Sequence, residues 1–259
     1  MTGIDEGPAG WPAPGRGWRE ITPGVWRRRL PGWDETVGAV AGRDGLLLVD
    51  AGPSLAAGAE LREQLAGGSR PPVRWLAVTH PHFDHLLGAG AFPEAELLAA
   101  AGAEPPWPAG APAAVADGVA LGLDRAEAAR SGAALPAPHR LVTDALTLDL
   151  GRGRRATLTN LGPAHSGHDL VVKVTDPAGP PVVFCGDVVE ESGEPQAGPD
   201  AAPARWPAAL DRLLALGGER ARYVPGHGAV VDAAFVRSQR AALARRFEVP
   251  DEPHRDAGT

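Results

Sequence analysis

The chain has almost no cysteine, and lysine, methionine and tyrosine are equally scarce. Its single cysteine, Cys185, excludes an internal disulfide, so nothing in the sequence points to an oxidising compartment. Cys185 lies within an apolar run and is expected to be a small buried core residue.

The sequence also lacks segments that direct a chain into a membrane. No basic region followed by an apolar core stands at the N-terminus, and no apolar run approaches the length of a membrane span. We therefore expect a cytoplasmic protein without a membrane partner. The net charge of −7 argues against nucleic-acid binding through a general basic surface, so a small molecule is the expected partner. The sequence predicts no oligomeric state.

The 259 residues suffice for one domain with a substantial core. We predict a flexible N-terminal tail over residues 1–17, one domain over residues 18–249 and a disordered C-terminal tail over residues 250–259. Residues 101–139 are rich in alanine, proline and glycine. They predict a lid-like insertion whose helix covers residues 119–131, with a flexible linker as the alternative.

Apolar runs of two kinds alternate along this domain. Short runs bounded by turn residues predict strands at 36–41, 46–50, 73–78, 96–99, 143–150, 155–161, 170–175 and 182–185, a strand that starts at 25–27 and a short strand that starts at Tyr223. Apolar residues at helical spacing predict helices at 53–65, 203–216 and 233–247, the first of them ended by Gly67 and Gly68.

The richest chemistry lies directly after one of these strands. His80, His82, Asp84 and His85 put three histidines and an aspartate within six positions of a strand-to-helix loop. Imidazole and carboxylate ligands suit zinc, iron, manganese or cobalt. His80 and His82 alternate and so share a face in an extended stretch, whereas Asp84 and His85 follow where the chain turns. This spacing suggests two metal ions, and a histidine-rich surface turn is the alternative.

Three further residues of metal-binding type lie at or just beyond the ends of predicted strands: His165, Asp187 and His227. Each alone is more typical of a solvated or capping residue. In this order, and together with the first cluster, they indicate a metal site.

Four segments of the chain resemble the metal motifs of the metallo-β-lactamase superfamily, and residues 47–52 resemble the strand and turn that precede the first of them. The four segments are residues 79–85, 162–168, 184–187 and 225–228. The resemblance implies an α+β fold, the four-layer αββα sandwich, in which two sheets pack face to face and helices cover both outer sides. The metals would lie at one edge, between the two halves.

The resemblance also implies a role for each candidate ligand. His80, His82 and His165 would hold the first metal. Asp84, His85 and His227 would hold the second, and Asp187 would bridge the two. Some true β-lactamases have cysteine at the bridging position, whereas aspartate is typical of most hydrolases of the superfamily.

The implied enzyme is a dinuclear metal-dependent hydrolase with two divalent ions, Zn²⁺ by preference and Fe or Mn as alternatives. A metal-bridging hydroxide would attack an ester, lactone, thioester or related bond. Asp84 would be catalytic as well as a ligand, orienting the nucleophile and shuttling a proton. Asp50 would brace the His80 loop from outside the ligand set. His168 would be an outer-shell partner or proton relay, with a structural hydrogen bond as the alternative.

Three aromatic residues are candidates for the walls of the substrate pocket: Trp33, Trp107 and Tyr223. Trp33 lies in a loop expected to overhang the metals, Trp107 in the lid-like insertion, and Tyr223 close to His227. Core packing is the alternative for Trp33 and Tyr223.

Other functions of the same fold remain as alternatives. A mononuclear iron oxidoreductase similar to persulfide dioxygenases would leave Asp84, His85 and His227 without a role. A phosphodiesterase or nuclease would be expected to carry a basic surface or an RNA-gripping extension, and a binding module to have lost ligands. The single lysine, Lys173, lies in a strand away from the metal motifs, which disfavours the carboxylate recognition that true β-lactamases use.

Overall fold

The structure is a computed structural model that describes residues 17–66, 71–102 and 107–250. The two predicted tails lie outside these residues, apart from Gly17 and Pro250, and so do Gly67 and Gly68. No helix in the described part of the chain is both long enough and apolar enough to cross a membrane.

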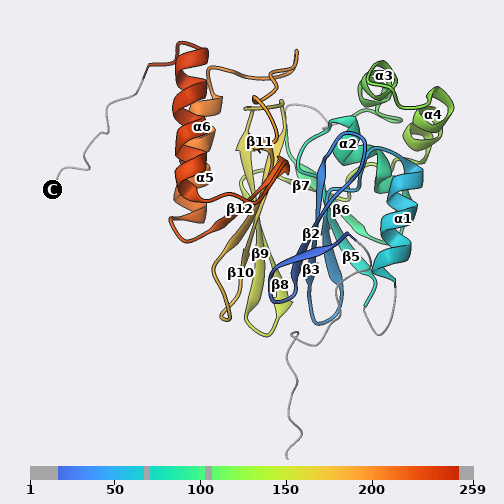
Figure 1. Cartoon of the computed structure of the whole chain (residues 1–259). Coiled ribbons are helices and arrows are strands. Elements are labelled where there is room, and N and C mark those ends of the chain that lie inside the picture. The colour runs from blue at the N-terminus through green and yellow to red at the C-terminus, as the bar shows by residue number, and fades with distance from the viewer. Residues whose placement is uncertain (1–16, 67–70, 103–106, 251–259) are drawn as a thin grey trace, which may run out of the picture.

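Two sheets form the centre of the molecule (Figure 1). The seven strands of the first sheet follow chain order: β1 (Arg19–Thr22), β2 (Val25–Arg29), β3 (Thr36–Ala41), β4 (Leu46–Val49), β5 (Val73–Ala77), β6 (Glu96–Ala100) and β7 (Arg140–Val142). Strands β1 to β4 pair antiparallel, and β4 to β7 pair parallel.

The second sheet has five strands in the order β12-β11-β10-β9-β8. They are β8 (Ala145–Gly151), β9 (Arg154–Gly162), β10 (Asp169–Thr175), β11 (Val182–Glu190) and β12 (Arg222–His227). All neighbours pair antiparallel except β11 and β12, which are parallel.

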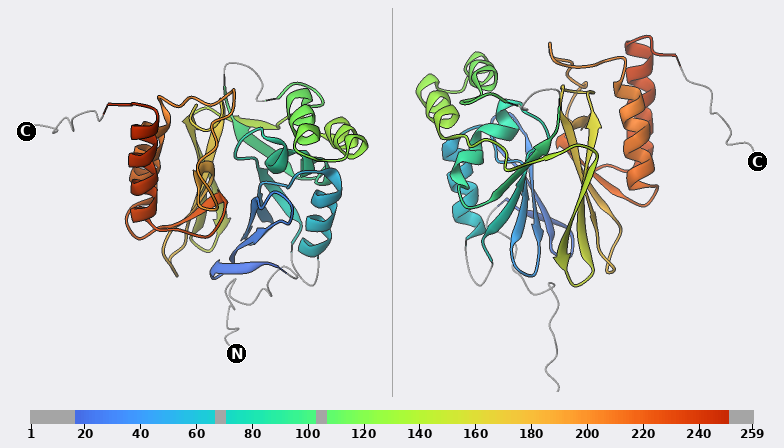
Figure 2. Two further views of the ribbon diagram at one scale, coloured as in Figure 1. Left: turned by 45° about the horizontal axis from the view of Figure 1, so that its top comes forward. Right: turned by 180° about the vertical axis from the view of Figure 1, so that it is seen from behind.

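Helices cover the outer face of each sheet, as the further views in Figure 2 also show. On the first sheet lie α1 (Leu55–Leu65), α2 (Phe83–Leu86), the 3₁₀ helix η2 (Leu87–Ala91), α3 (Pro112–Ala120) and α4 (Arg125–Ala134). On the second lie α5 (Trp206–Gly217) and α6 (Ala233–Arg246). The expected four-layer αββα sandwich is therefore confirmed.

Strand β4 shows why continuous apolar runs build this sandwich. Its side chains alternate between two cores: Leu46 and Leu48 face the helices outside the first sheet, whereas Leu47 and Val49 face the second sheet. A third core lies between the second sheet and α5 and α6, where Cys185 is buried as expected.

Three local predictions were wrong or incomplete. The helix expected over residues 119–131 is divided between α3 and α4, because Gly122 adopts a left-handed φ of 103° in the intervening turn. The short strands β1 and β7 were missed. The strand expected to end at Cys185 continues to Glu190, so Asp187 lies within β11, just after an irregularity at Gly186.

Candidate metal centre

The loop after β5 carries the densest part of the site, and the buried carboxylate of Asp50 holds it in place. Asp50 is 2% exposed and follows β4, the neighbouring parallel strand. It accepts hydrogen bonds from the Thr79 backbone N–H (2.7 Å) and the Thr79 hydroxyl (2.9 Å), and its Oδ2 lies 2.9 Å from Nδ1 of His85. One carboxylate thus fixes both the start of the loop and the ring of His85.

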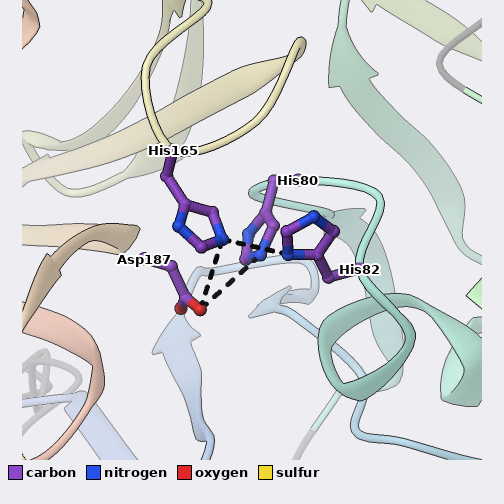
Figure 3. Close-up of side chains that lie close together, drawn as sticks. All are labelled: His80, His82, His165 and Asp187. Atoms are coloured by element: carbon purple, nitrogen blue, oxygen red, sulfur yellow. Dashed lines mark hydrogen bonds and ion pairs between the residues drawn. The ribbon is translucent and has the colours of Figure 1, made fainter. Parts of the chain in front are cut away.

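Four candidate ligands meet where this loop faces the second sheet (Figure 3): His80, His82, His165 and Asp187. One ligand atom from each lies within 4.8 Å of all the others. His165 Nε2 is 2.9 Å from His82 Nδ1, and Asp187 Oδ2 is 3.6 Å from His165 Nε2 and 3.8 Å from His80 Nε2. Both halves of the sandwich therefore contribute to this first group.

Asp84, His85 and His227 form a second group of the same kind. Asp84 Oδ2 lies 3.2 Å from His227 Nε2 and 3.5 Å from His85 Nε2. Asp187 joins the two groups, because its Oδ1 is 3.1 Å from His85 Nε2 and its Oδ2 is 3.3 Å from His227 Nε2. The structure thus assembles all seven residues of the expected ligand set.

The histidine rings are oriented from outside the two groups. Three of them place Nδ1 against an outer acceptor and leave Nε2 facing the site: His85 against the Asp50 carboxylate, His165 against the Gln196 carbonyl (3.1 Å) and His227 against the Trp33 carbonyl (2.9 Å). An outer acceptor of this kind is the usual way in which a protein fixes the tautomer of a metal-binding histidine.

In His82 the two ring nitrogens have exchanged these roles. Its Nε2 lies 3.1 Å from a carboxylate oxygen of Asp200, and its Nδ1 faces His165. Sequence reasoning missed Asp200, because it lies in a loop far along the chain with no motif around it. Only the fold brings that loop over His82.

Divalent metal ions fit the donor atoms of this site. His80 Nε2 and Asp187 Oδ1 are buried and make no hydrogen bond within the described residues, which is costly unless another partner satisfies them. Burial lowers the pKa of His80 well below its ordinary value and that of His165 to about 4, so both rings are neutral, as metal binding requires. Burial opposes ionisation of Asp187, but the charges of His85 and His227 more than offset it and hold its pKa well below the usual range.

Comparison with known proteins agrees with this geometry. A family model described as the metallo-beta-lactamase superfamily matches residues 30–227, which is more than half of the chain. The chain belongs to the metallo-β-lactamase superfamily. The matched range contains all seven residues of the two groups. No curated protein sequence matches the chain.

Solved structures of the superfamily share the fold at low sequence identity. The metallo-β-lactamase FIM-1 from Pseudomonas aeruginosa, in its mono-zinc form, is 23% identical with a TM-score of 0.63, and the match covers 90% of this chain and 96% of that one. A metallo-β-lactamase from Pontibacter korlensis is 19% identical with a TM-score of 0.65, covering 87% and 97%. One from Hirschia baltica is 18% identical with a TM-score of 0.60, covering 87% and 96%.

A pocket of about 440 Å³ opens over the two groups of this superfamily member. Trp33 forms part of the pocket wall, which was one of the two predictions made for this residue. The Trp33 indole donates a hydrogen bond to the Leu121 carbonyl (3.2 Å), and its ring meets that of Phe83 edge-on at 5.3 Å between centroids. The turn between α3 and α4 therefore borders the pocket, which is where the lid-like insertion was expected.

The structure places the other two aromatic candidates outside the pocket, which for Tyr223 agrees with the alternative of core packing. Trp107 is 6% exposed, packs in the core beneath the helices of the first sheet, and donates from its indole to the Pro136 carbonyl (3.3 Å). Tyr223 is fully buried in the core next to α5 and α6, and its hydroxyl donates to the Gly218 carbonyl (3.0 Å). Both indole and phenol find their partners in the backbone, away from the pocket.

The expected outer-shell role of His168 finds no support in the contacts of its ring. The ring packs against Gly102, where a Cβ atom would lie 1.7 Å from His168 Cε1. No hydrogen bond joins this ring to a metal-site residue within the described chain, and its Nδ1 is buried without a partner there. Asp169, which follows it, holds the His165 loop instead by accepting from the Ala164 N–H (2.8 Å) and the Ser166 hydroxyl (2.8 Å).

Two buried glutamates beside the site were also missed. Glu190 accepts from the backbone N–H of Gln196 (3.1 Å), the residue whose carbonyl orients His165. Burial, and then the charge of Asp187, raise the pKa of Glu190 to about 8. Glu35 is 0% exposed, pairs through its backbone with His227, and has no hydrogen bond to either carboxyl oxygen within the described residues.

Glu35 gives the metal-free protein a specific dependence of stability on pH. Burial, to which the charge of Asp84 adds, raises the pKa of Glu35 from 4.5 to about 7. The folded chain therefore holds this proton more tightly than the unfolded chain does. Its free energy of unfolding falls as the pH rises from about 4.5 to about 7 and stays lower above that range. We expect Glu35→Gln to stabilise the metal-free protein at pH 8 by roughly 1–3 kcal/mol.

Urea unfolding of the chelator-treated protein at pH 8 and at pH 4.5 measures this effect. The difference between Glu35→Gln and the wild type should fall to a small fraction of its value at the lower pH, where the folded wild-type carboxyl is protonated and about half of the unfolded chains carry the proton as well. Glu63→Gln, an exposed substitution on α1 with the same change of charge, is the control and should shift neither midpoint. Equal effects of Glu35→Gln at both pH values would contradict a raised pKa of Glu35 as the cause.

Proposed function

We propose that this chain is a dinuclear metal-dependent hydrolase that cleaves an ester, lactone, thioester or related bond of a small molecule. The observation that carries the proposal is the position of Asp187. Its two oxygens lie 3.1 Å from His85 and 3.3 Å from His227 in one group, and 3.6 Å from His165 in the other. A carboxylate between two complete groups of ligands suits a site for two neighbouring ions.

His80, His82 and His165 would hold the first ion, and Asp84, His85 and His227 the second. Asp187 would be common to both. Zn²⁺ is the ion we propose, with Fe or Mn as alternatives, because nitrogen and carboxylate donors suit all three. When bound, such ions supply Lewis acidity and lower the pKa of a water molecule towards about 7.

The residues of the chain then have separate tasks. Asp84 is buried and lines the pocket, where its carboxylate can orient the attacking water and accept its proton. Asp50, Gln196 and Asp200 keep the rings of His85, His165 and His82 in the orientation that exposes the ligand nitrogen. Trp33 and Phe83 give the pocket an apolar wall, which excludes water from one side of a bound substrate.

The second group of ligands separates this proposal from a mononuclear iron oxidoreductase. Asp84, His85 and His227 are brought within 4.8 Å of one another from two distant parts of the chain. A site for one ion would leave them without a ligand role, and mutually close buried titratable groups are costly to assemble without a partner. Their assembly supports two ions.

The test is a metal count by plasma mass spectrometry before and after reconstitution, followed by hydrolysis of a panel of esters, lactones and thioesters. We expect about two Zn, Mn or Fe per chain, as a bridged pair of ions requires, and hydrolysis that a chelator abolishes. One iron per chain that reconstitution does not raise would contradict the dinuclear site and favour oxygen chemistry. No metal after reconstitution would contradict the whole proposal.

A further inference from the structure

We propose that the pocket selects its substrate by charge, favouring molecules whose part distant from the scissile bond is positively charged or neutral and rejecting anionic ones. This inference rests on the proposed function and narrows its substrate class. Among the described residues that line the pocket, two carry exposed or half-exposed carboxylates near its mouth, Asp117 and Asp200, and none is lysine or arginine.

Asp117 is the carboxylate most open to a ligand. It lies on the exposed face of α3, one turn before Leu121, whose carbonyl holds Trp33. No hydrogen bond or ion pair engages the Asp117 carboxylate within the described residues. Its charge is therefore available to a molecule in the pocket.

Asp200 contributes a second charge from another part of the pocket lining, the loop that precedes α5. One of its oxygens lies 3.1 Å from His82 Nε2, yet 44% of its side chain stays exposed to solvent. The remaining face of the carboxylate adds to the negative potential of the mouth.

Two arginines that contact residues next to the pocket wall are already engaged, and Arg125 and Arg205, which are exposed, lie outside the residues that line the pocket. Arg29 forms an ion pair with Asp34, next to Trp33, with Nε 2.7 Å from the carboxylate. Arg246 lies 3.5 Å from Glu194 and donates to the Pro195 carbonyl, just before Gln196 of the pocket wall. Each guanidinium is paired with a carboxylate, so neither supplies the free cation that would hold an anionic substrate.

The apolar wall fits the same class of molecule. Trp33, Phe83 and Leu121 offer an aromatic and aliphatic surface beside the two carboxylates. An aliphatic chain ending in an ammonium group would pack on this surface, and the indole face also attracts a cation. A carboxylate or phosphate in the same place would meet two like charges. Metal ions act at the reacting carbonyl, whereas these carboxylates act on the distant part of the substrate.

Three esters of one alcohol, with acyl chains of equal length ending in an ammonium, a methyl or a carboxylate group, test the proposal on the metal-loaded protein. We expect kcat/KM to fall in that order, with the cationic ester preferred over the anionic one by about tenfold at low ionic strength. Asp117→Asn should reduce this ratio by about two- to fivefold, and about 0.5 M salt should remove most of it.

Glu63→Gln is the matched control, because it removes one exposed negative charge on α1, outside the residues that line the pocket. It should leave the ratio unchanged, which separates a local effect from that of net charge. Asp200→Asn is less suitable, since it also alters the partner of His82. An unchanged ratio in Asp117→Asn, or a preference for the anionic ester, would overturn charge selection while leaving the hydrolase in place.

A second readout does not depend on turnover. Three thiols with one six-carbon chain and an amine, hydroxyl or carboxylate end would bind the loaded metal site through sulfur, and calorimetry gives their Kd. We expect the amine to bind more tightly than the carboxylate, by a ratio that falls in Asp117→Asn. The expected thiol order without hydrolysis of any ester would support charge selection and overturn ester hydrolysis. Failure to load metal would overturn both.

Discussion

Asp187→Ala is expected to lower kcat/KM for any hydrolysed substrate at least about a thousandfold and to remove metal from both positions. The Asp187 carboxylate reaches both ligand groups: it lies 3.1 Å from His85 on one side and 3.6 Å from His165 on the other. Without this carboxylate, the Nε2 atoms of His80 and His165 would lose the negative charge beside them, and Asp84 alone would remain beside His85 and His227. Metal content and kcat/KM on the same preparation measure the effect.

The fold should survive this substitution, because Asp187 contacts the ligands rather than the three hydrophobic cores. Circular dichroism and thermal unfolding of the chelated protein check this point. Asp44→Ala, in the exposed turn between β3 and β4, is the control and should keep full activity. His82→Ala should also abolish hydrolysis. Full activity in either metal-site variant would contradict the dinuclear model.

Asp50→Ala is expected to weaken metal binding about 10–100-fold and to destabilise the fold by about 3–5 kcal/mol. Three buried donors share this carboxylate: the N–H and hydroxyl of Thr79 and the ring of His85. Removing it leaves them unpaired in the interior. Alanine is also strained at this position, where the backbone adopts a left-handed φ of 62°. Urea unfolding and competition with a chromophoric chelator measure the two effects.

Asp50→Asn separates these two effects. Asparagine keeps one acceptor oxygen for Thr79 and tolerates the left-handed backbone, so the free energy of unfolding should drop by only about 1–2 kcal/mol. Its NH₂ group, however, would face His85 Nδ1 and favour the tautomer that carries the proton on Nε2. That nitrogen is the one directed at Asp187. Metal affinity should therefore fall as far as in Asp50→Ala, and an Asn variant with wild-type affinity would show that Asp50 does not act through the His85 tautomer.

The ligands could be predicted from the sequence because the feature that marks them is local. His80 to His85 crowd one strand-to-helix loop, and His165 and His227 lie at or near strand ends, where a sandwich presents side chains to its edge, whereas Asp187 lies within β11 beside the irregularity at Gly186. The αββα topology, by contrast, came from the resemblance to a family and not from periodicity. Short apolar runs specify strands without specifying their order in a sheet.

The residues that orient the ligands could not be predicted, because they act across the fold. Asp200 lies 118 positions from His82 along the chain, and Glu35 reaches the site only through the pairing of its backbone with His227. Trp107 and Tyr223 were named as pocket candidates because of their positions in the sequence. Each is close in sequence to a functional segment, but proximity in sequence does not tell which side of a sheet a side chain faces. Both rings point into a core.

Trp33 connects the pocket wall to the candidate metal site through two hydrogen-bonding contacts. Its indole holds the turn between α3 and α4 at Leu121, and its backbone carbonyl, 2.9 Å from Nδ1, fixes the ring of His227. Displacement of that turn by an entering molecule would therefore shift a residue that orients a ligand of the second group. In the proposed enzyme, substrate entry and metal coordination would in this way be mechanically linked, and bulky substrates would be expected to alter the coordination of a second ion as well as fill the pocket.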